Sequence, residues 1–132
     1  MPRVLLVDDD PDIQETLRFA LEHESCEVES VRDGHAVLEV ARRFAPQVVL
    51  LDVMLPGANG YELSRLLRQE TSAGRLPSFG IVILTARRVA SAARREFLDT
   101  WSGADATLWK PFDVQVLLHE VRRLAAPIQG EP

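Results

Sequence analysis

The chain has 132 residues, 46% of them hydrophobic and 27% charged, and a formal net charge of −5. This length is typical of one domain that buries its own core, and the acidic balance argues against direct contact with nucleic acid. No apolar run approaches the roughly 20 residues of a membrane helix, and the run after Arg3 is too short for a signal peptide, so we expect a cytoplasmic protein without membrane contact.

The first half of the chain alternates between strand and helix patterns. In chain order these are a strand at Arg3–Val7, a helix with the apolar stripe Ile13, Leu17, Ala20 and Leu21, a strand at Glu27–Val31, a helix with the stripe Ala36, Val37, Val40, Ala41 and Phe44, and a strand at Gln47–Leu51. Asp10 is the predicted N-cap of the first helix and Pro11 its first residue. Asp33 is predicted to cap the second helix, which Pro46 ends.

The second half continues the alternation. It contains a helix with the stripe Leu63, Leu66 and Leu67, a strand at Gly80–Leu84, a helix with the stripe Val89, Ala93, Phe97 and Trp101, a strand at Asp105–Trp109, and a helix with the stripe Val114, Leu117, Leu118, Val121 and Leu124. Together these predict an α/β fold, a doubly wound five-stranded parallel sheet in the flavodoxin-like order 2-1-3-4-5 with helices on both faces. We expect this domain to occupy residues 1–126, with 127–132 as a tail or the start of a linker, and Cys26 to be a packing residue.

Four of the predicted strands are followed directly by side chains that can do chemistry. These are Asp8-Asp9-Asp10, Asp52, Thr85 and Lys110, which is the only lysine among 15 basic residues. The carboxyl ends of parallel strands meet at one edge of a doubly wound sheet, so we expect these groups to converge.

Converging carboxylates repel one another, and a hard divalent cation relieves that repulsion. Magnesium suits such a cluster because it prefers oxygen ligands and shares its remaining positions with phosphate oxygens. One carboxylate could then attack a phosphoryl donor to give an aspartyl phosphate, while Lys110 and Thr85 neutralise the phosphoryl oxygens. A simpler interpretation is that the three adjacent acids only cap the first helix, although one acid would be enough for that.

The same residues resemble the receiver domains of bacterial two-component response regulators, from Arg3 to about Ala125. The resemblance is carried by Val4-Leu5-Leu6-Val7-Asp8-Asp9-Asp10-Pro11, by the segment from Val48 to Gly60, by Leu84-Thr85-Ala86, and by Gly103-Ala104-Asp105 with Lys110-Pro111-Phe112. These four motifs occur in the order that the family shows.

The resemblance implies a role for each motif. Asp52 would be the phosphoacceptor, Asp8 and Asp9 would hold Mg²⁺ together with Asp52 and the Met54 carbonyl, Thr85 and Lys110 would contact the phosphoryl group, and Lys110-Pro111 would be a cis bond. A histidine kinase or histidine phosphotransfer protein would donate the phosphoryl group to a signalling switch that catalyses only its own phosphorylation and dephosphorylation. The signal would pass through the face formed by the fourth helix, fifth strand and fifth helix to an output domain or protein.

The chain departs from the family pattern on that output face. Thr107 stands where the family usually has an aromatic switch residue, and Ala106 where dimerising DNA-binding members tend to have a second acid, so the oligomeric state stays open. Trp109 shares a side of its strand with Thr107 and is either a replacement for the switch aromatic or a static side chain. Met54 and Arg87 occupy the positions at which the family varies phosphoryl lifetime.

Three other classes are less consistent with these residues. A phosphohydrolase with an aspartyl nucleophile commonly has a second acid two residues later, where this chain has Met54. A binding module that lost phosphorylation would lack Asp52, the acidic pair or Lys110, and all are present. A flavin-binding domain would need a phosphate loop rich in Ser, Thr or Gly where the chain has three aspartates.

Overall fold

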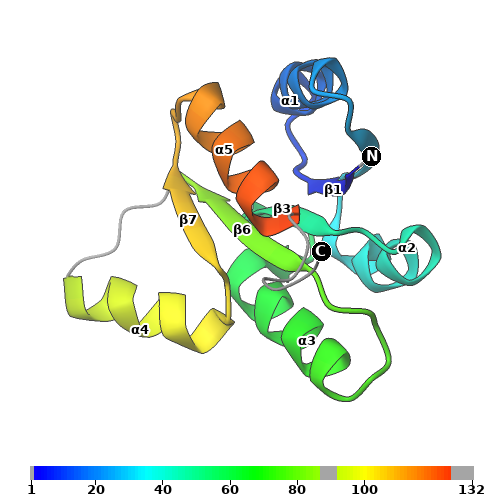
Figure 1. The fold of residues 1–132 in the computed structure, drawn as a ribbon. Coiled ribbons are helices and arrows are strands. Elements are labelled where there is room, and N and C mark those ends of the chain that lie inside the picture. Colours follow the sequence, from blue (N-terminus) through cyan, green and yellow to red (C-terminus); the bar gives the residue numbers. More distant parts are fainter. Residues whose placement is uncertain (1, 87–91, 126–132) are drawn as a thin grey trace.

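Five parallel strands form one sheet in the computed structural model, which describes residues 2–86 and 92–125 (Figure 1). They pair in the order β2-β1-β3-β6-β7, with β1 at Arg3–Val7, β2 at Glu27–Val31, β3 at Val48–Asp52, β6 at Gly80–Thr85 and β7 at Ala106–Trp109. Two short strands, β4 at Met54–Leu55 and β5 at Ala58–Asn59, form a separate antiparallel pair. When only the five sheet strands are counted, the order is the predicted 2-1-3-4-5, so the fold class is confirmed.

Helices cover both faces of this sheet (Figure 1). Their bounds are α1 at Pro11–His23, η1 at Gly34–Ala36, α2 at Val37–Phe44, α3 at Gly60–Ser72, α4 at Ala92–Ser102 and α5 at Val114–Ala125. Leu5 and Val7 of β1 lie in one core with α2 and α3, whereas Val4 and Leu6 lie in the other with α1 and α5. This division follows from the alternation of side chains along a strand.

The central strands extend further toward the functional edge than the sequence predicted. All residues of β3 and β6 are buried, and pairing continues to Asp52 opposite Leu84. Asp52 and Thr85 are therefore the last residues of buried strands, not loop residues. The predicted starts at Gln47 and Asp105 are each one residue early.

Near the amino end of α2, Asp33 has a different role from the predicted one. The backbone N–H of His35 donates to Asp33 Oδ1 at 2.8 Å, so this aspartate caps η1 instead of α2. The prediction for Asp10 is confirmed, because its carboxylate accepts from the Asp12 N–H at 2.9 Å with Pro11 at the first helical position. Cys26 is buried in the core, as expected of a packing residue.

The buried face of α4 was predicted incorrectly. Phe97 is 61% exposed and Ala93 is also exposed, whereas Leu98 and Trp101 pack against the core. Val89 lies outside the residues that the structure describes. The reason for the difference is that α4 packs mainly against α3, so its position relative to that helix, not its own apolar period, decides which residues are covered.

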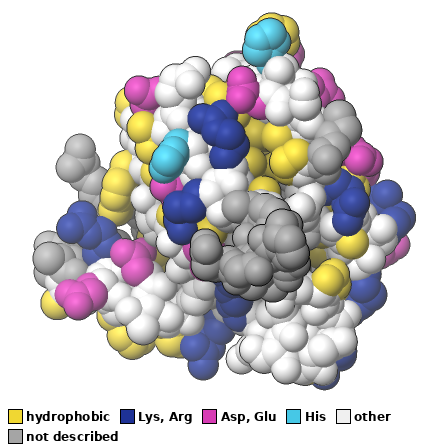
Figure 2. Space-filling view, viewed as in Figure 1, with side chains coloured by type: hydrophobic (Ala, Val, Ile, Leu, Met, Phe, Trp, Pro, Cys, Tyr) yellow, Lys and Arg dark blue, Asp and Glu magenta, His cyan; other side chains and the backbone are white. Residues whose placement is uncertain are grey.

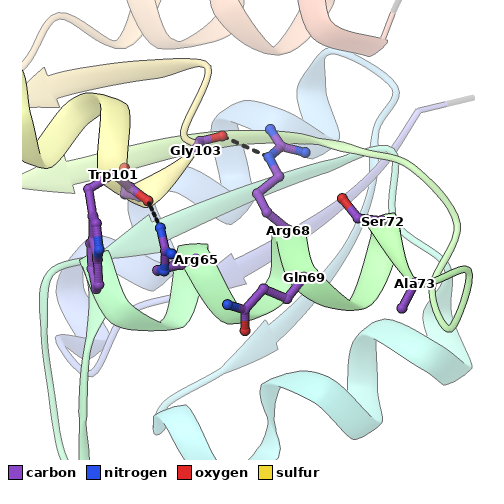
Figure 3. Close-up of a pocket in the computed structure, with 8 residues that line it drawn as sticks. Arg65, Arg68, Gln69, Ser72, Ala73, Trp101 and Gly103 are labelled. Carbon is purple, nitrogen blue, oxygen red and sulfur yellow. Dashed lines mark hydrogen bonds between the residues drawn. The ribbon is translucent and has the colours of Figure 1, made fainter.

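The contacts between α3 and the end of α4 involve three consecutive carbonyls. Ser64 Oγ donates to the Ser102 carbonyl at 2.8 Å, Arg65 to the Trp101 carbonyl at 3.1 Å, and Arg68 Nε to the Gly103 carbonyl at 2.7 Å. Figure 3 shows the two arginines reaching from α3 along a hollow between the helices. Carbonyls at a helix C-terminus lack intrahelical partners and carry partial negative charge, so these donors fix the end of α4 on α3.

Two expectations fall partly outside the described residues. The predicted domain boundary at 126 and the tail 127–132 lie beyond α5, which ends at Ala125, and Arg87 lies between β6 and α4 in the range 87–91. In the portions that are described, no helix combines the length and the apolar character needed to cross a membrane.

Adjacent leucines of α3 give a direct test of the core. Leu67 is fully buried and Leu66 is 38% exposed. We expect Leu67→Ala to lower the free energy of unfolding by about 2–5 kcal/mol, because it leaves a cavity against the sheet. Leu66→Ala, the matched control, should cost less than about 1 kcal/mol in urea denaturation followed by circular dichroism. Equal losses in the two variants would contradict the described orientation of α3.

Candidate functional site

The carboxyl ends of four strands bring the predicted polar residues together at one edge of the sheet. Asp8 follows β1, Asp52 ends β3, Thr85 ends β6 and Lys110 follows β7. The carboxylate oxygens of Asp8, Asp9 and Asp52 lie within 4.8 Å of one another. Thr85 is fully buried, and its carbonyl accepts from the Lys110 backbone N–H at 2.8 Å.

Lys110 joins the two buried acids of the cluster. Its Nζ donates to Asp8 Oδ2 at 3.0 Å and to Asp52 Oδ1 at 3.2 Å, and its side chain is 17% exposed. The peptide bond to Pro111 is cis, as the resemblance implied. One ammonium group therefore partly compensates two carboxylates that have almost no contact with solvent.

Burial and charge change the proton affinities of this pair in a definite direction. Burial, and then the negative charge of Asp8, raise the pKa of Asp52 above its ordinary value, although Lys110 and the Met54 backbone N–H oppose the change. Burial alone would lower the pKa of Lys110, but its hydrogen bonds and charge interactions with Asp8 and Asp52 outweigh burial and raise that pKa. Lys110 thus stays charged, and the cluster retains an excess of negative charge.

The three consecutive aspartates divide into different roles. Asp10 caps α1, so the simpler interpretation holds for that residue. Asp8 is fully buried, and its Oδ1 accepts from the Asp10 N–H at 2.9 Å while its Oδ2 faces Lys110. Asp9 is exposed beside an open hollow of about 420 Å³ that Met54 and Asn59 also line. Capping therefore accounts for one of the three acids.

The segment after Asp52 approaches the strand closely, and only glycine fits there. A Cβ atom at Gly60 would lie 2.3 Å from the Asp52 carbonyl oxygen and 2.6 Å from Val53 Cα. Asn59 caps α3 by accepting from the Tyr61 N–H at 2.8 Å, and the Gly60 N–H donates to the Val53 carbonyl at 2.8 Å. This close approach could not be predicted from the sequence, in which the only indication is a glycine next to a potential helix cap.

The acidic cluster has the composition and spacing of a hard-cation site. Magnesium binds oxygens at about 2.0–2.1 Å, so ligands on opposite sides of an ion lie roughly 4 Å apart. One carboxylate oxygen from each of Asp8, Asp9 and Asp52 lies within 4.8 Å of the other two, which is close to that span. A bound cation would also reduce the repulsion from Asp8 that, after burial, raises the pKa of Asp52. These residues fit a magnesium ion.

Beyond the cluster, β7 and α4 are joined by two side-chain contacts. Thr107 Oγ1 and Asp99 Oδ1 lie 3.1 Å apart and form a hydrogen bond, and the Arg95 guanidinium lies 5.6 Å from the centre of the Trp109 ring. Trp109 is half-buried and directly precedes Lys110. Thr107, which stands where the family resemblance led us to expect an aromatic residue, therefore forms a hydrogen bond to α4.

Comparison with known proteins gives one consistent result. The family model described as the response regulator receiver domain matches residues 4–122. The DNA-binding response regulator MtrA of Mycolicibacterium smegmatis is 36% identical over 130 residues, and the response regulator MprA of Mycobacterium leprae is 41% identical over 122. The BeF₃-activated receiver domain of Klebsiella pneumoniae RstA has a TM-score of 0.81 at 29% identity, covering 95% of this chain and 99% of that one.

The matching relatives are longer than this chain. The MtrA alignment covers 98% of this chain but 53% of the relative, and the MprA alignment covers 92% and 50%, so the chain spans about half their length. The name of MtrA includes DNA binding, so the expected lack of nucleic-acid contact cannot be extended to full-length relatives.

On the face of this chain shown in Figure 2, basic and acidic side chains are interspersed. For this chain alone, absence of direct contact stays a prediction.

The raised pKa of Asp52 predicts that Asp52→Asn stabilises the metal-free protein at neutral pH. A carboxyl whose pKa is raised by folding favours the folded state below its unfolded pKa, and this contribution is lost as pH rises through the folded pKa. Asparagine does not ionise, so its advantage should be largest at neutral pH and should shrink in acid. Thermal unfolding at several pH values without divalent ions measures the difference.

A matched control for this comparison is Glu15→Gln, which removes an exposed carboxylate of α1. Its stability should stay within about 0.5 kcal/mol of the wild type. If Asp52→Asn were instead less stable than the wild type at neutral pH, this would contradict the conclusion that burial and the charge of Asp8 disfavour the ionised Asp52 carboxylate.

Proposed function

The chain belongs to the response regulator receiver domain family, and we propose that it is a switch that accepts a phosphoryl group on Asp52 with the help of Mg²⁺. The observation that carries this proposal is the buried Asp52 carboxylate, held 3.2 Å from Lys110 Nζ within a group of three acids. The three carboxylates can bind a metal ion, whose remaining coordination positions phosphoryl oxygens can fill. The ammonium group beside Asp52 can stabilise the negative charge of that phosphoryl group.

In the proposed cation site, Asp8, Asp9 and Asp52 supply carboxylate oxygens and Met54 its backbone carbonyl. When bound, a magnesium ion would neutralise the oxygens of an incoming phosphoryl group and orient that group toward Asp52. Lys110 Nζ is within hydrogen-bonding distance of both Asp8 and Asp52, and Thr85 ends β6, the strand that pairs with β3. We assign both residues to the remaining phosphoryl oxygens.

The transfer step uses the Asp52 carboxylate as the nucleophile. One Asp52 oxygen forms a bond to the phosphorus of a phosphohistidine, the phosphorus–nitrogen bond breaks, and its electron pair remains on the imidazole, which takes up a proton from solvent. The signal ends by hydrolysis of the aspartyl phosphate. Water attacks phosphorus, the bond between phosphorus and the Asp52 oxygen breaks, and Asp52 returns as a carboxylate with release of inorganic phosphate. The chain thus acts only on itself and is not a classical enzyme.

Phosphorylation would redirect Lys110 and Thr85 toward the new charge. Lys110 now pairs with Asp8 and Asp52, and three phosphoryl oxygens would compete for its ammonium. Because Trp109 precedes Lys110 and Thr107 binds Asp99 of α4, movement at Lys110 would be transmitted to the face formed by α4, β7 and α5. We propose this face as the output surface, acting on a further domain or a partner protein.

A groove beside Lys110 is suited to the phosphoryl donor. It has a volume of about 480 Å³ and is lined mainly by apolar side chains of α1 and of the segment after β7, namely Ile13, Leu17, Pro111, Phe112 and Val114. We propose that a histidine kinase or histidine phosphotransfer protein docks here, which would place the chain in the cytoplasm. The relatives carry about as many further residues as this chain covers, consistent with an output domain in those proteins.

The proposed acceptor is tested by intact-mass measurement after incubation with a small phosphodonor and Mg²⁺. The wild type should gain one phosphoryl group, and Asp52→Asn should gain none because the nucleophile is absent. Lys110→Ala should still be labelled, at least tenfold more slowly, since the metal site remains but one charge on the phosphoryl oxygens is lost. Labelling of Asp52→Asn at the wild-type rate would overturn the assignment.

The two tryptophans predict where activation is detected by fluorescence. Trp101 lies at the end of α4 that is fixed to α3, with Arg65 stacked 4.8 Å from its ring centre, whereas Trp109 adjoins Lys110. On titration with Mg²⁺ and beryllium fluoride, a phosphoryl mimic, Trp101→Phe should keep the wild-type response and Trp109→Phe should lose it. The opposite result would contradict the proposed route through β7.

The same variants address the role of Trp109 as a replacement for the switch aromatic. If Trp109→Phe binds its output partner with the activation-dependent gain of the wild type, the indole only reports the change. Loss of that gain, with normal phosphorylation, would assign the switch to Trp109.

A further inference from the structure

Gln14 connects the functional ends of β1 and β2 from the first turns of α1. Its Nε2 donates to the Asp8 carbonyl at 2.5 Å and to the Val31 carbonyl at 3.1 Å. The Asp8 backbone N–H also donates to the Val31 carbonyl at 3.1 Å. Both amide hydrogens of Gln14 are therefore used at the point where the chain leaves the sheet and enters the acidic loop.

The two acids that follow β1 are held in different ways. The Asp8 carboxylate accepts from the Asp10 N–H and pairs with Lys110. The Asp9 carboxylate has no hydrogen-bond or ion-pair partner among residues 2–86 and 92–125, and it is exposed. Among the described residues, no side-chain contact therefore holds the Asp9 carboxylate, and its position depends on the backbone from which it departs and on its own rotamer.

The Asp8 carbonyl belongs to the peptide group that joins Asp8 to Asp9. A peptide group is planar, so holding its oxygen restricts the orientation of the plane from which the Asp9 residue departs. Gln14 fixes the oxygen, and the bond from the Asp8 N–H to Val31 fixes the strand end before it. Magnesium demands nearly ideal octahedral geometry, so the direction of Asp9 matters more for this ion than for one with flexible coordination.

We propose that Gln14 is a positioning residue for the cation site, acting through the Asp8–Asp9 peptide to orient the Asp9 carboxylate. The inference rests on the proposed function, because it assigns to Gln14 a part in forming the Mg²⁺ site. The side-chain hydrogen bonds of Gln14 go to the carbonyls of Asp8 and Val31, and none goes to Asp9. Its effect is on the geometry of a ligand, and so on the affinity and selectivity for the ion.

The chain offers a matched control one helical turn away. Arg18 also reaches from α1 to β2, donating to the Val28 carbonyl at 3.2 Å and to Ser30 Oγ at 2.7 Å. It holds the helix on the same strand but does not contact the Asp8–Asp9 peptide. Loss of Arg18 should therefore loosen the α1–β2 contact without turning Asp9.

The experiment compares Gln14→Met, Gln14→Glu and Arg18→Met in the full chain. Methionine keeps the length of glutamine but has no donor, and glutamate places a charged acceptor against two carbonyl oxygens. Isothermal titration with Mg²⁺ and with Ca²⁺ gives affinities, and thermal unfolding without metal gives stability. Asp52→Asn and Asp9→Ala provide reference values for loss of a ligand.

We expect Gln14→Met to bind Mg²⁺ about 10–100-fold more weakly than the wild type, the range found for lost outer-shell contacts of metal ligands. Its preference for Mg²⁺ over Ca²⁺ should fall, because Ca²⁺ tolerates irregular geometry. Arg18→Met should lose stability but keep its Mg²⁺ affinity and ion preference. Gln14→Glu should also lose the preference, which keeps the test decisive if the methionine variant folds poorly.

Two results would overturn the positioning role. One is wild-type Mg²⁺ affinity in a folded Gln14→Met, and the other is an equal loss in Gln14→Met and Arg18→Met, which would indicate general loosening. Either leaves the proposed function intact if the wild type binds Mg²⁺ and Asp52→Asn binds it more weakly. A wild type that shows no Mg²⁺ binding dependent on Asp52 would overturn both proposals.

Discussion

Mutual repulsion between buried carboxylates is the constraint on which this structure depends. Asp8 and Asp52 end neighbouring strands, have almost no contact with solvent, and share a single ammonium group, that of Lys110. Burial, and then the negative charge of Asp8, raise the pKa of Asp52, and the single positive charge of Lys110 only partly opposes this change. An arrangement with this excess of negative charge favours the binding of a cation, and in the proposed function that cation would offset the negative charge of an incoming phosphoryl group.

The sheet makes that constraint possible by holding the charged groups rigidly. Asp52 and Thr85 are the final residues of the two central strands, which are buried over their whole length between the two cores. Close packing keeps such residues from relaxing away from one another. Gly60 contributes by allowing the chain after Asp52 to return against its backbone. The stability of the core therefore offsets the electrostatic cost at its edge.

The face that we propose for output is held by different forces. The C-terminal end of α4 is fixed to α3 by hydroxyl and guanidinium donors, whereas the residues from 93 to 97 are all exposed. Between these parts, Thr107 forms a hydrogen bond with Asp99, at the position where the family resemblance led us to expect an aromatic residue. A hydrogen bond depends on direction more strongly than an apolar contact does, so coupling through Thr107 would respond to small rotations of α4.

The sequence by itself determined the alternation of strands and helices and the identity of the groups at the strand ends. These features follow from local periodicity and from the rule that parallel strands end at one edge. Tertiary structure alone decided which face of α4 is buried, that Lys110 pairs with Asp8 as well as Asp52, why Gly60 must be glycine, and that Gln14 reaches the Asp8 carbonyl. Each of these depends on contacts between segments whose relative placement is set by packing of the whole core, and no local pattern encodes such distances.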